Sequence, residues 1–381
     1  MALYNVGQLK DSVSGMLQGI DLNSVTNLNK ALERAVRTLV SKVDIPEASA
    51  KQAITLYSGV YDYLAPTNIF GGAVTDFRPQ GVSRNQLDYV YKKPIELFDR
   101  TKALIPNGFA LTFEHNKGVG IVRIASPKPT PRAELDPMNS TTGWTAAGSA
   151  SALVADETVF YDSPASLRFT LTGSSTGTLT KAVNQVDISS YEDVAVGFLA
   201  IRTPSITNLT NIAVRVGSSD SAYDEVTDTD GFLGAWVVNE YLLVAFDFSG
   251  ATSTGTPDWN AIDYIQIRIA HTGTITNFYV GGFWLSLPTP CELHYQTSSL
   301  FLRSGALSKT ITDDTDEIIL NDAAYLLYEH ECAIAIAEQA SGGNLDGVAL
   351  GYKNKLDKDL YPIYRADNPS EEIRQIGSYY D

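Results

Sequence analysis

Residues 241–269, YLLVAFDFSGATSTGTPDWNAIDYIQIRI, carry the clearest strand pattern in the chain. Two short apolar runs, 242–248 and 264–269, are separated by a stretch rich in Gly, Ser, Thr, Pro and Asp. Branched and aromatic side chains fit the pleated surface of a sheet, and the residues between the runs are those that form turns. This stretch therefore predicts two β-strands joined by an irregular connection.

The same pattern extends over a central segment, residues 138–287, which shows no convincing helical period. Four more strands are predicted in it, at 167–172, 194–201, 212–217 and 278–285. Short strands at regular spacing, with Gly, Ser, Thr and Asp between them, are typical of a β-sandwich or jelly roll. The segment is also acidic: its 15 Asp and Glu against 5 Lys and Arg give −10 of the chain's net charge of −16.

Proline-rich segments stand on both sides of this β-segment. Residues 127–131 read PKPTP, and residues 287–290 read LPTP. Proline fixes φ and lacks a backbone N–H, so such segments are stiff, extended linkers. We therefore predict that 1–133 and 291–381 are two parts of one scaffold, and that 134–290 is a β-sandwich domain inserted between them.

Helical patterns lie outside the β-segment, where apolar residues recur at steps of three and four. The predicted helices are 6–17, 24–43, 318–340 and 345–360. Ser24 is the expected N-cap of the second helix, and Pro362 is expected to end the last one. None of these helices can bury its apolar face alone, so we expect them to pack together.

A change to a period of two marks residues 53–64, AITLYSGVYDYL, which are predicted to form a β-hairpin ending at Pro66. Further strands are predicted at 108–114 and 119–125. The fold class is therefore α+β: a helical scaffold with a β-hairpin, interrupted by an all-β jelly-roll insertion.

The sequence shows no pattern that would carry catalysis or hold a metal or cofactor. The four histidines lack metal-ligand spacing to one another or to Cys291 and Cys332, and no serine sits in a nucleophile elbow. The acidic run 312–317 lacks the glycine and distal Glu of a calcium loop and is expected to cap the following helix. Residues 220–230 are expected to be a solvated loop, with calcium bound at the edge of the sandwich as the alternative. We predict a binding or assembly protein, not an enzyme, with no cofactor.

Net charge and hydropathy limit the partners and the location. A charge of −16 argues against a surface that coats DNA, because phosphate binding needs clustered Lys and Arg. No run approaches the roughly 20 apolar residues of a membrane span. The first ten residues, MALYNVGQLK, lack the basic and apolar regions of a secretory signal. We therefore expect no membrane contact and synthesis in a cytoplasm.

Aromatic side chains in the β-segment could stack on the face of a sugar ring. Trp236 follows a glycine-flanked loop, and Trp259 follows Pro257 and Asp258. These two, with Tyr223, are the candidates for glycan stacking. Trp284 alternates within an apolar strand and is expected to be buried.

The chain outside the β-segment resembles the head–tail adaptor family of tailed bacteriophages, also called head-completion or neck proteins. The resemblance rests on the order of an early helix, ITLYSGVYDYLAP, the pair EIILNDAAYLLYEHECAIAIAEQA and NLDGVALGYKNKLDKDL, and an extended polar tail from about residue 366. It implies a virion protein, assembled in the host cytoplasm, that forms a ring of usually twelve copies beneath the portal. DNA would pass through the lumen without sequence-specific binding. Residues that would dock the tail in the portal are Ile373, Ile376, Tyr379 and Tyr380.

The β-segment is similar to galactose-binding-like jelly rolls of the carbohydrate-binding-module type. The matching phrases include SPASLRFTLTG, VDISSYEDVAVGFLAIR and TNFYVGGFWL. Gly281 and Gly282 stand where that family commonly carries an acidic residue before its final strand. The resemblance implies a jelly-roll fold that could bind surface glycans.

Two functions follow from these resemblances. The leading hypothesis is an adaptor ring between portal and tail, in contact with other neck or tail proteins, with an outward β-domain for decoration or glycan adhesion. The alternative is a tail or baseplate receptor-binding protein whose jelly roll binds carbohydrate. Binding to glycans without association with a portal would favour the alternative.

Overall fold

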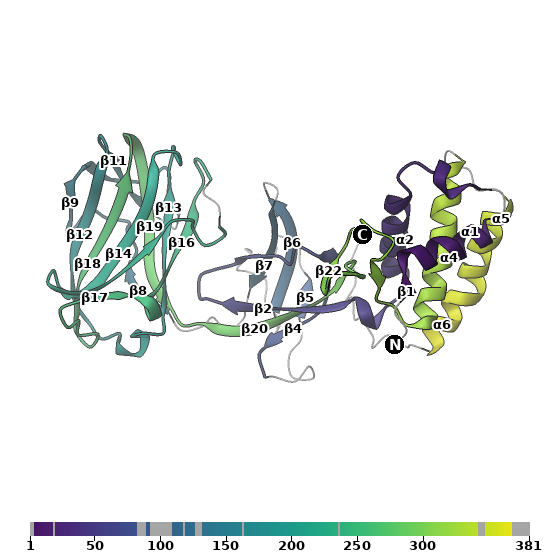
Figure 1. The fold of residues 1–381 in the computed structure, drawn as a ribbon. Coiled ribbons are helices and arrows are strands. Elements are labelled where there is room, and N and C mark those ends of the chain that lie inside the picture. Colours follow the sequence, from purple (N-terminus) through teal and green to yellow (C-terminus); the bar gives the residue numbers. More distant parts are fainter. Residues whose placement is uncertain are drawn as a thin grey trace. The chain divides into compact units, whose positions relative to one another are not determined.

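The computed structural model describes residues 4–17, 20–81, 89–91, 109–116, 119–125, 132–161, 164–234, 237–341 and 347–367. The chain divides into two compact units (Figure 1). The first unit comprises Met1–Ile54, Leu64–Pro127 and Cys291–Asp381. The second comprises Thr55–Tyr63 and Lys128–Pro290.

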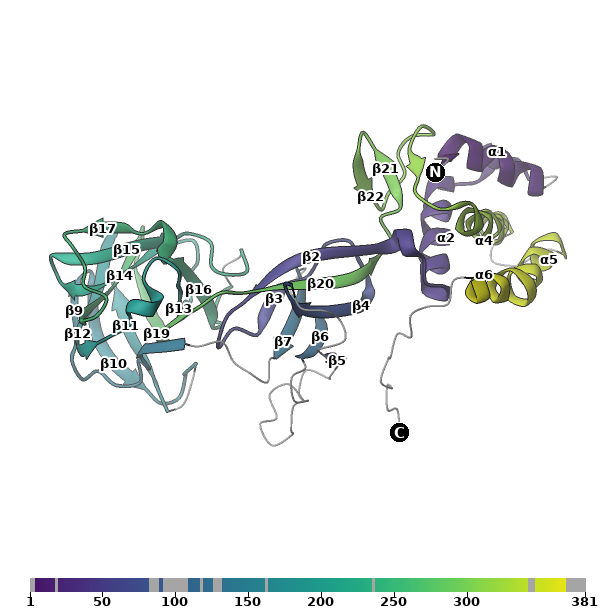
Figure 2. The same cartoon turned by 90° about the horizontal axis from the view of Figure 1, so that it is seen from below.

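Two six-stranded sheets make up the second unit, and they face each other as a sandwich (Figures 1 and 2). One sheet has the order β10-β11-β19-β13-β16, with β8 also paired to β19, and the other has the order β17-β15-β14-β18-β12-β9. The strands of the first are β8 (Arg132–Asp136), β10 (Ala150–Asp156), β11 (Ser166–Leu171), β13 (Val196–Arg202), β16 (Leu242–Asp247) and β19 (Ile275–Ser286). The strands of the second are β9 (Trp144–Gly148), β12 (Ser175–Val186), β14 (Leu209–Ser219), β15 (Ala222–Asp228), β17 (Thr252–Thr254) and β18 (Ile262–His271).

Alternating side chains of the two sheets fill the space between them. Ile265, Ile267 and Ile269 of β18 are fully buried there, as are Val214 and Val216 of β14. Because successive side chains of a strand point to opposite faces, the residues between them point away from the core. The predicted β-sandwich is confirmed, and the six predicted strands are present as β11, β13, β14, β16, β18 and β19.

Residues 53–64 do not form the predicted β-hairpin. β2 (Ser49–Leu56) lies beside β20 (Thr289–Thr297), whereas β3 (Asp62–Leu64) belongs to a different sheet. The backbone N–H of Ser58 instead donates to Ser286 Oγ at 2.7 Å, and Trp284 Nε1 donates to the carbonyl of Ser58 at 2.8 Å. Since these groups bond to β19, they are not available for a hairpin ladder.

Aromatic contacts hold the same segment on the sandwich. The ring of Tyr57 lies 5.1 Å from that of Phe198, which stacks on Trp284 at 5.9 Å. Trp284 is buried, as predicted, although it lies on the outer side of its sheet beneath this segment. The second unit therefore includes residues 55–63, which lie far before the predicted domain boundary at 134. Residues 64–127, which belong to the first unit, separate this segment from the rest of the second unit.

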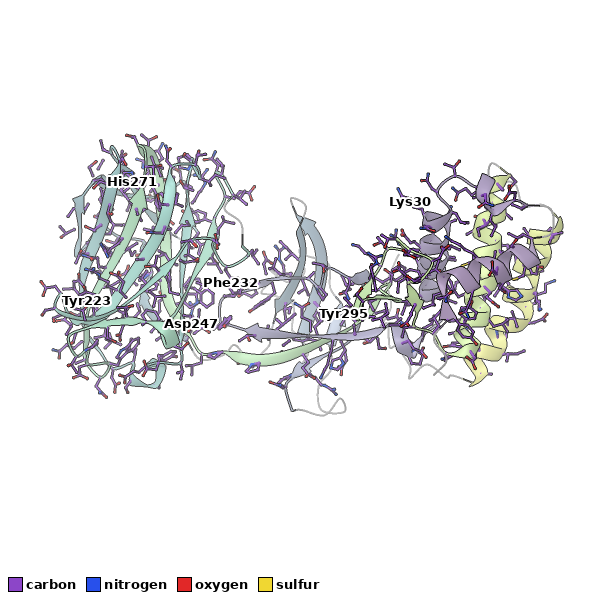
Figure 3. The ribbon with its side chains drawn as sticks, viewed as in Figure 1. Lys30, Tyr223, Phe232, Asp247, His271 and Tyr295 are labelled. Atoms are coloured by element: carbon purple, nitrogen blue, oxygen red, sulfur yellow. The ribbon has the colours of Figure 1, made fainter. Side chains whose placement is uncertain are left out.

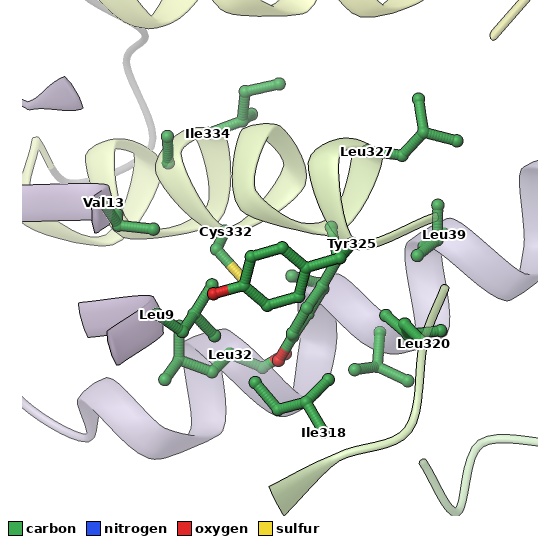
Figure 4. Close-up of a cluster of buried hydrophobic side chains, with 14 of the residues drawn as sticks. Leu9, Val13, Leu32, Leu39, Ile318, Leu320, Tyr325, Leu327, Cys332 and Ile334 are labelled. Carbon is green, nitrogen blue, oxygen red and sulfur yellow. The ribbon is translucent and has the colours of Figure 1, made fainter. Parts of the chain in front are cut away.

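The helices of the first unit come from both ends of the chain. They are α1 (Val6–Met16), α2 (Leu28–Lys42), α4 (Asp322–Ala340), α5 (Gly347–Lys355), the π-helical turn η6 (Leu356–Leu360) and α6 (Tyr361–Asp367). α4 packs against α1, α2 and α5, and one apolar cluster joins them (Figure 4). Within it, Leu9 and Leu32 from one end meet Tyr325 and Cys332 from the other.

Three helix ends differ from the sequence predictions. Ser24 lies in a single 3-10 turn, and Asn27, in the left-handed region at φ 59°, precedes α2. α4 begins only after Asn321, whose Oδ1 accepts from the N–H of Ala324 at 2.8 Å; the residues before it include a short strand, β23 (Glu317–Ile318). Pro362 does not end the last helix, because the wider π-helical turn before it accommodates a residue without an N–H donor.

Further strands belong to the first unit. They are β1 (Tyr4–Asn5), β4 (Ile69–Pro79), β5 (Tyr89–Tyr91), β6 (Phe109–Asn116), β7 (Val119–Ala125), β21 (Phe301–Arg303) and β22 (Ala306–Ser308). β20 pairs with β4 in an antiparallel ladder, as do β6 and β7, which are the strands predicted at 108–114 and 119–125. No helix of the described ranges is long and apolar enough to cross a membrane.

The acidic run 312–317 does not cap a helix, because its one deeply buried carboxylate is bound elsewhere. Asp316 is 2% exposed, and Arg303 donates to its two oxygens from Nε and Nη2, each at 3.1 Å. The backbone N–H of Thr312 donates to it at 2.9 Å. The Arg303 guanidinium lowers the pKa of Asp316 to about 2.

This carboxylate gives the first unit an acid-sensitive stability. Since the pKa of Asp316 is lowered from 3.8 to about 2, its contribution is complete above about pH 4 and is lost as the pH falls through about 2. We expect the melting temperature of the first unit to fall over that window, and to fall less in Asp316→Asn. Circular dichroism melts between pH 6 and 2 would measure it. Asp314→Asn, at an exposed carboxylate, is the matched control; an unchanged pH profile in Asp316→Asn would contradict the assignment.

Candidate functional site

A row of polar side chains crosses the outer face of the second sheet. Its members lie directly opposite one another on six neighbouring strands, and we call them the polar row: Thr252, Glu225, Arg215, Gln266, Thr180 and Thr145. Their chain neighbours in β14 and β18 are the core valines and isoleucines described above, so the period of two places the row on the solvent side.

Hydrogen bonds join the middle of the row into one network. Arg215 donates from Nε to Glu225 and from Nη1 to Gln266 Oε1, the second at 3.1 Å. Gln266 Nε2 then donates to Thr180 Oγ1 at 2.9 Å. Arg268 lies two residues after Gln266 in β18, and its Nη1 donates to Glu225 Oε2 at 2.8 Å. Each side chain is thus held by its neighbours, and the network fixes the planes of the guanidinium and amide groups.

The charges of the network are paired but remain in reach of solvent. Burial raises the pKa of Glu225, but the hydrogen bonds from Arg215 and Arg268 lower it more, so its pKa lies below the ordinary value. Burial likewise lowers the pKa of Arg215, and Glu225 raises it above the usual range. The side chains of Arg215 and Arg268 are 21% and 33% exposed. Glu225 and Arg215 are therefore ionised at neutral pH, and the network is accessible to a ligand.

Two tyrosines lie beside the row. Tyr223 of β15 and Tyr264 of β18 both stand opposite Gly217, and their ring centroids are 6.1 Å apart. A Cβ at Gly217 would lie 2.1 Å from the carbonyl oxygen of Ala222, so only glycine fits between them. The guanidinium of Arg215 lies 4.3 Å from the ring centroid of Tyr223.

Tyr223 is therefore next to the candidate site, but it is not the exposed stacking ring that the sequence predicted. It is only 9% exposed, and Arg215 covers a face of its ring. Figure 3 labels Tyr223 at one end of the sandwich and His271 at the other.

The prediction that Trp259 is exposed is wrong. Its side chain is 2% exposed, lies edge-on to Phe248 at 5.5 Å, and donates from Nε1 to Asp224 Oδ2 at 2.7 Å. A proline turn precedes it, but the indole points into the core because Asp224 provides a partner for its N–H there. Trp236 lies outside the described residues, as do the four predicted portal-docking residues of the tail.

The acidic residues 220–230 are not a solvated loop, since most of them form β15. Asp224 is buried and also accepts from Ser253 Oγ at 2.6 Å, while Glu225 belongs to the polar row. Within the described part of the chain, no group of three His, Cys, Asp or Glu could hold a metal ion.

Arg215, Gln266 and Arg268 were not among the site residues predicted from the sequence. Their signal is nonetheless present: in IAVRVG and YIQIRI, single polar residues alternate with Ile and Val, so they must lie on the face opposite the core. What the sequence does not show is that these two strands are neighbours.

Comparison of the chain with solved structures gives likenesses at low sequence identity. No protein-family model and no curated protein matches the chain. It is similar to the family 11 carbohydrate-binding module from Clostridium thermocellum, solved with a β-1,3-1,4-mixed-linked tetrasaccharide, at 14% identity over 42% of this chain and 96% of that chain, with a TM-score of 0.31. The family 30 module of a cellulosomal cellulase of Clostridium thermocellum is 14% identical over 42% of this chain and 96% of that chain, with a TM-score of 0.29. The carboxy-terminal family 22 module of Clostridium thermocellum Xyn10B is 15% identical over 41% of this chain and 91% of that chain, with a TM-score of 0.27.

These structures are carbohydrate-binding modules, and they give no support to the resemblance to head–tail adaptors, which stays a prediction.

Proposed function

We propose that the second sheet of the sandwich binds a carbohydrate chain along the polar row. The observation that carries the proposal is the hydrogen-bonded network of Glu225, Arg215, Gln266 and Thr180 across four strands. Sugar hydroxyls both donate and accept, and guanidinium, carboxylate and amide groups offer paired donors and acceptors in fixed planes. Five steps of about 4.8 Å between strands make the row roughly 24 Å long, which is enough for several sugar rings.

The preorganisation of the row favours binding rather than catalysis. Because Arg215 and Gln266 are already held by neighbours, a ligand does not have to order them, which lowers the entropic cost of association. Every charge in the network has an opposite charge beside it, so no group there is left as a free acid or base. We therefore assign the row a binding role, with no cofactor.

Truncation of the central glutamine tests the proposal. We expect Gln266→Ala to weaken glycan binding about tenfold, because it removes a link in the row and leaves Arg215 less fixed, a loss of about 1–1.5 kcal/mol. A glycan array would find the ligand, and titration calorimetry would give its Kd. Gln185→Ala, at an exposed position of the same strand as Thr180, is the matched control. Absence of any glycan ligand, or equal Kd values for Gln266→Ala and the wild type, would refute the proposal.

A second candidate function is the adaptor ring in a virion neck, with portal, neck or tail proteins as partners. It is favoured by apolar side chains that α5 and α6 leave about half exposed: Val348, Leu350 and Ile363. Contact between copies would cover such side chains. Electron microscopy of the protein with its portal tests this role, and failure to form rings there counts against it. Glycan binding without portal association would instead favour a tail or baseplate receptor-binding protein.

A further inference from the structure

A serine and a histidine form a close pair at the end of the sandwich, away from the polar row. Ser149 lies at the corner between β9 and β10, and His271 is the last residue of β18. Ser149 Oγ is 2.6 Å from His271 Nε2. His271 is 3% exposed, whereas Ser149 is only partly buried. Ser149 as a residue is thus partly exposed, while His271 is shielded from solvent.

The second ring nitrogen of His271 determines the direction of this hydrogen bond. Nδ1 lies 2.9 Å from the carbonyl oxygen of Gly273, which can only accept, so Nδ1 carries the proton. In the neutral ring Nε2 is then an acceptor, and Ser149 Oγ–H donates to it. A hydroxyl, a base that accepts its proton and a third group that orients the base are the arrangement of an activated nucleophile.

The backbone around Ser149 fixes the position of its hydroxyl. The N–H of Ser149 donates to the carbonyl of Thr176 at 3.2 Å, and its own carbonyl accepts from Thr172 at 3.0 Å. Gly148 before it has φ +64°, and a Cβ there would lie 2.4 Å from the oxygen of Thr176. A residue with a side chain would not fit at this corner, so the turn that presents Ser149 depends on glycine.

We propose that Ser149 is a nucleophile for acyl transfer from small carboxylic esters, with His271 as its general base. Ser149 Oγ bonds to the ester carbonyl carbon as its proton moves to Nε2 of His271. The bond from that carbon to the alcohol oxygen breaks, and the departing alcohol takes the proton from Nε2. Water then attacks the carbonyl carbon of the acyl-serine and gives a proton to Nε2. The bond from that carbon to Ser149 Oγ breaks, the carboxylic acid leaves, and Ser149 Oγ takes the proton back from Nε2. This activity differs from the absence of catalysis predicted from the sequence, and it does not depend on glycan binding by the polar row.

Labelling and hydrolysis of the full chain test the proposal. We expect a fluorophosphonate probe to label Ser149, and p-nitrophenyl acetate to be hydrolysed about 100-fold faster than by Ser149→Ala. Ser151→Ala is the matched control, since Ser151 lies two residues away on β10 and its hydroxyl donates to the carbonyl of Thr170 at 3.5 Å. Equal hydrolysis by the wild type and Ser149→Ala, or labelling at another residue only, would overturn the proposal.

The reactivity of a cysteine at position 149 tests, independently of catalysis, whether His271 acts as a base there. A thiol at position 149 would share its proton with His271, so Ser149→Cys should react with iodoacetamide at least tenfold faster at neutral pH than Ser151→Cys. The native cysteines do not interfere: both are buried, and burial raises the pKa of Cys291 to about 12 and that of Cys332 well above its usual range. Equal rates for the two variants would show that His271 does not activate this position and would overturn the proposal.

Discussion

Replacement of Trp259 by alanine is expected to lower the free energy of unfolding of the second unit by about 3–5 kcal/mol. The indole is 2% exposed between the two sheets and packs edge-on against Phe248. Its removal would leave a cavity, and Asp224 would lose the N–H that its Oδ2 accepts at 2.7 Å. Urea unfolding followed by circular dichroism at the β-sheet signal would measure the change.

Trp259→Phe separates the two effects. Phenylalanine keeps much of the apolar volume but cannot donate to Asp224, so this variant should lose less, about 1–3 kcal/mol for a buried acceptor that is left without its partner. A loss below about 1 kcal/mol in Trp259→Ala would mean that the indole lies on the surface, as the sequence had predicted, and would contradict the structure.

Replacement of Tyr328 by alanine should have an effect of similar size on the first unit, about 3–5 kcal/mol. Tyr328 is fully buried in α4, its ring lies 6.5 Å from that of Phe301, and its hydroxyl donates to the carbonyl of Leu32 at 3.0 Å. It thus connects the helices from the two ends of the chain. Calorimetric melting would report the loss as a lower transition temperature.

Tyr328→Phe is the control for the hydroxyl, and its expected loss is about 1 kcal/mol. The apolar clusters of the two units have no residue in common, so each variant should lower the stability of its own unit. If Tyr328→Ala and Trp259→Ala lowered one common transition by the same amount, the two units would unfold as one, and the division into two cores would not describe the energetics.

Local periodicity was enough to identify most of the secondary structure. The strands at 264–269 and 278–285 and the helix around Leu32 were predicted because burial on one face repeats every two or every 3.6 residues, and that repeat is visible in a single segment. β9, β10, β12 and β15 were not predicted, since Ser, Thr, Gly and acidic residues interrupt their apolar alternation.

Pairing between distant segments was beyond the sequence. ITLYSGVYDYL has the period of a hairpin, yet Ser58 bonds to Ser286 and Trp284, more than 200 residues away. Nothing near Ser58 in the chain indicates that β19 provides better partners for its backbone than the neighbouring strand does. A hairpin is predicted from local pattern alone, whereas the observed arrangement also depends on the burial of Trp284 beneath the segment.

The sequence by itself determined that 138–287 is an acidic β-sandwich, and it determined which residues of β14 and β18 face away from the core, because both follow from a pattern within each strand. Only the tertiary structure decided that Arg215 lies between Glu225 and Gln266, that Ser149 meets His271, and that Trp259 is buried. The physical reason is that strand order and register depend on the packing of the whole core, so side chains far apart in the sequence become neighbours only when every strand has found its place.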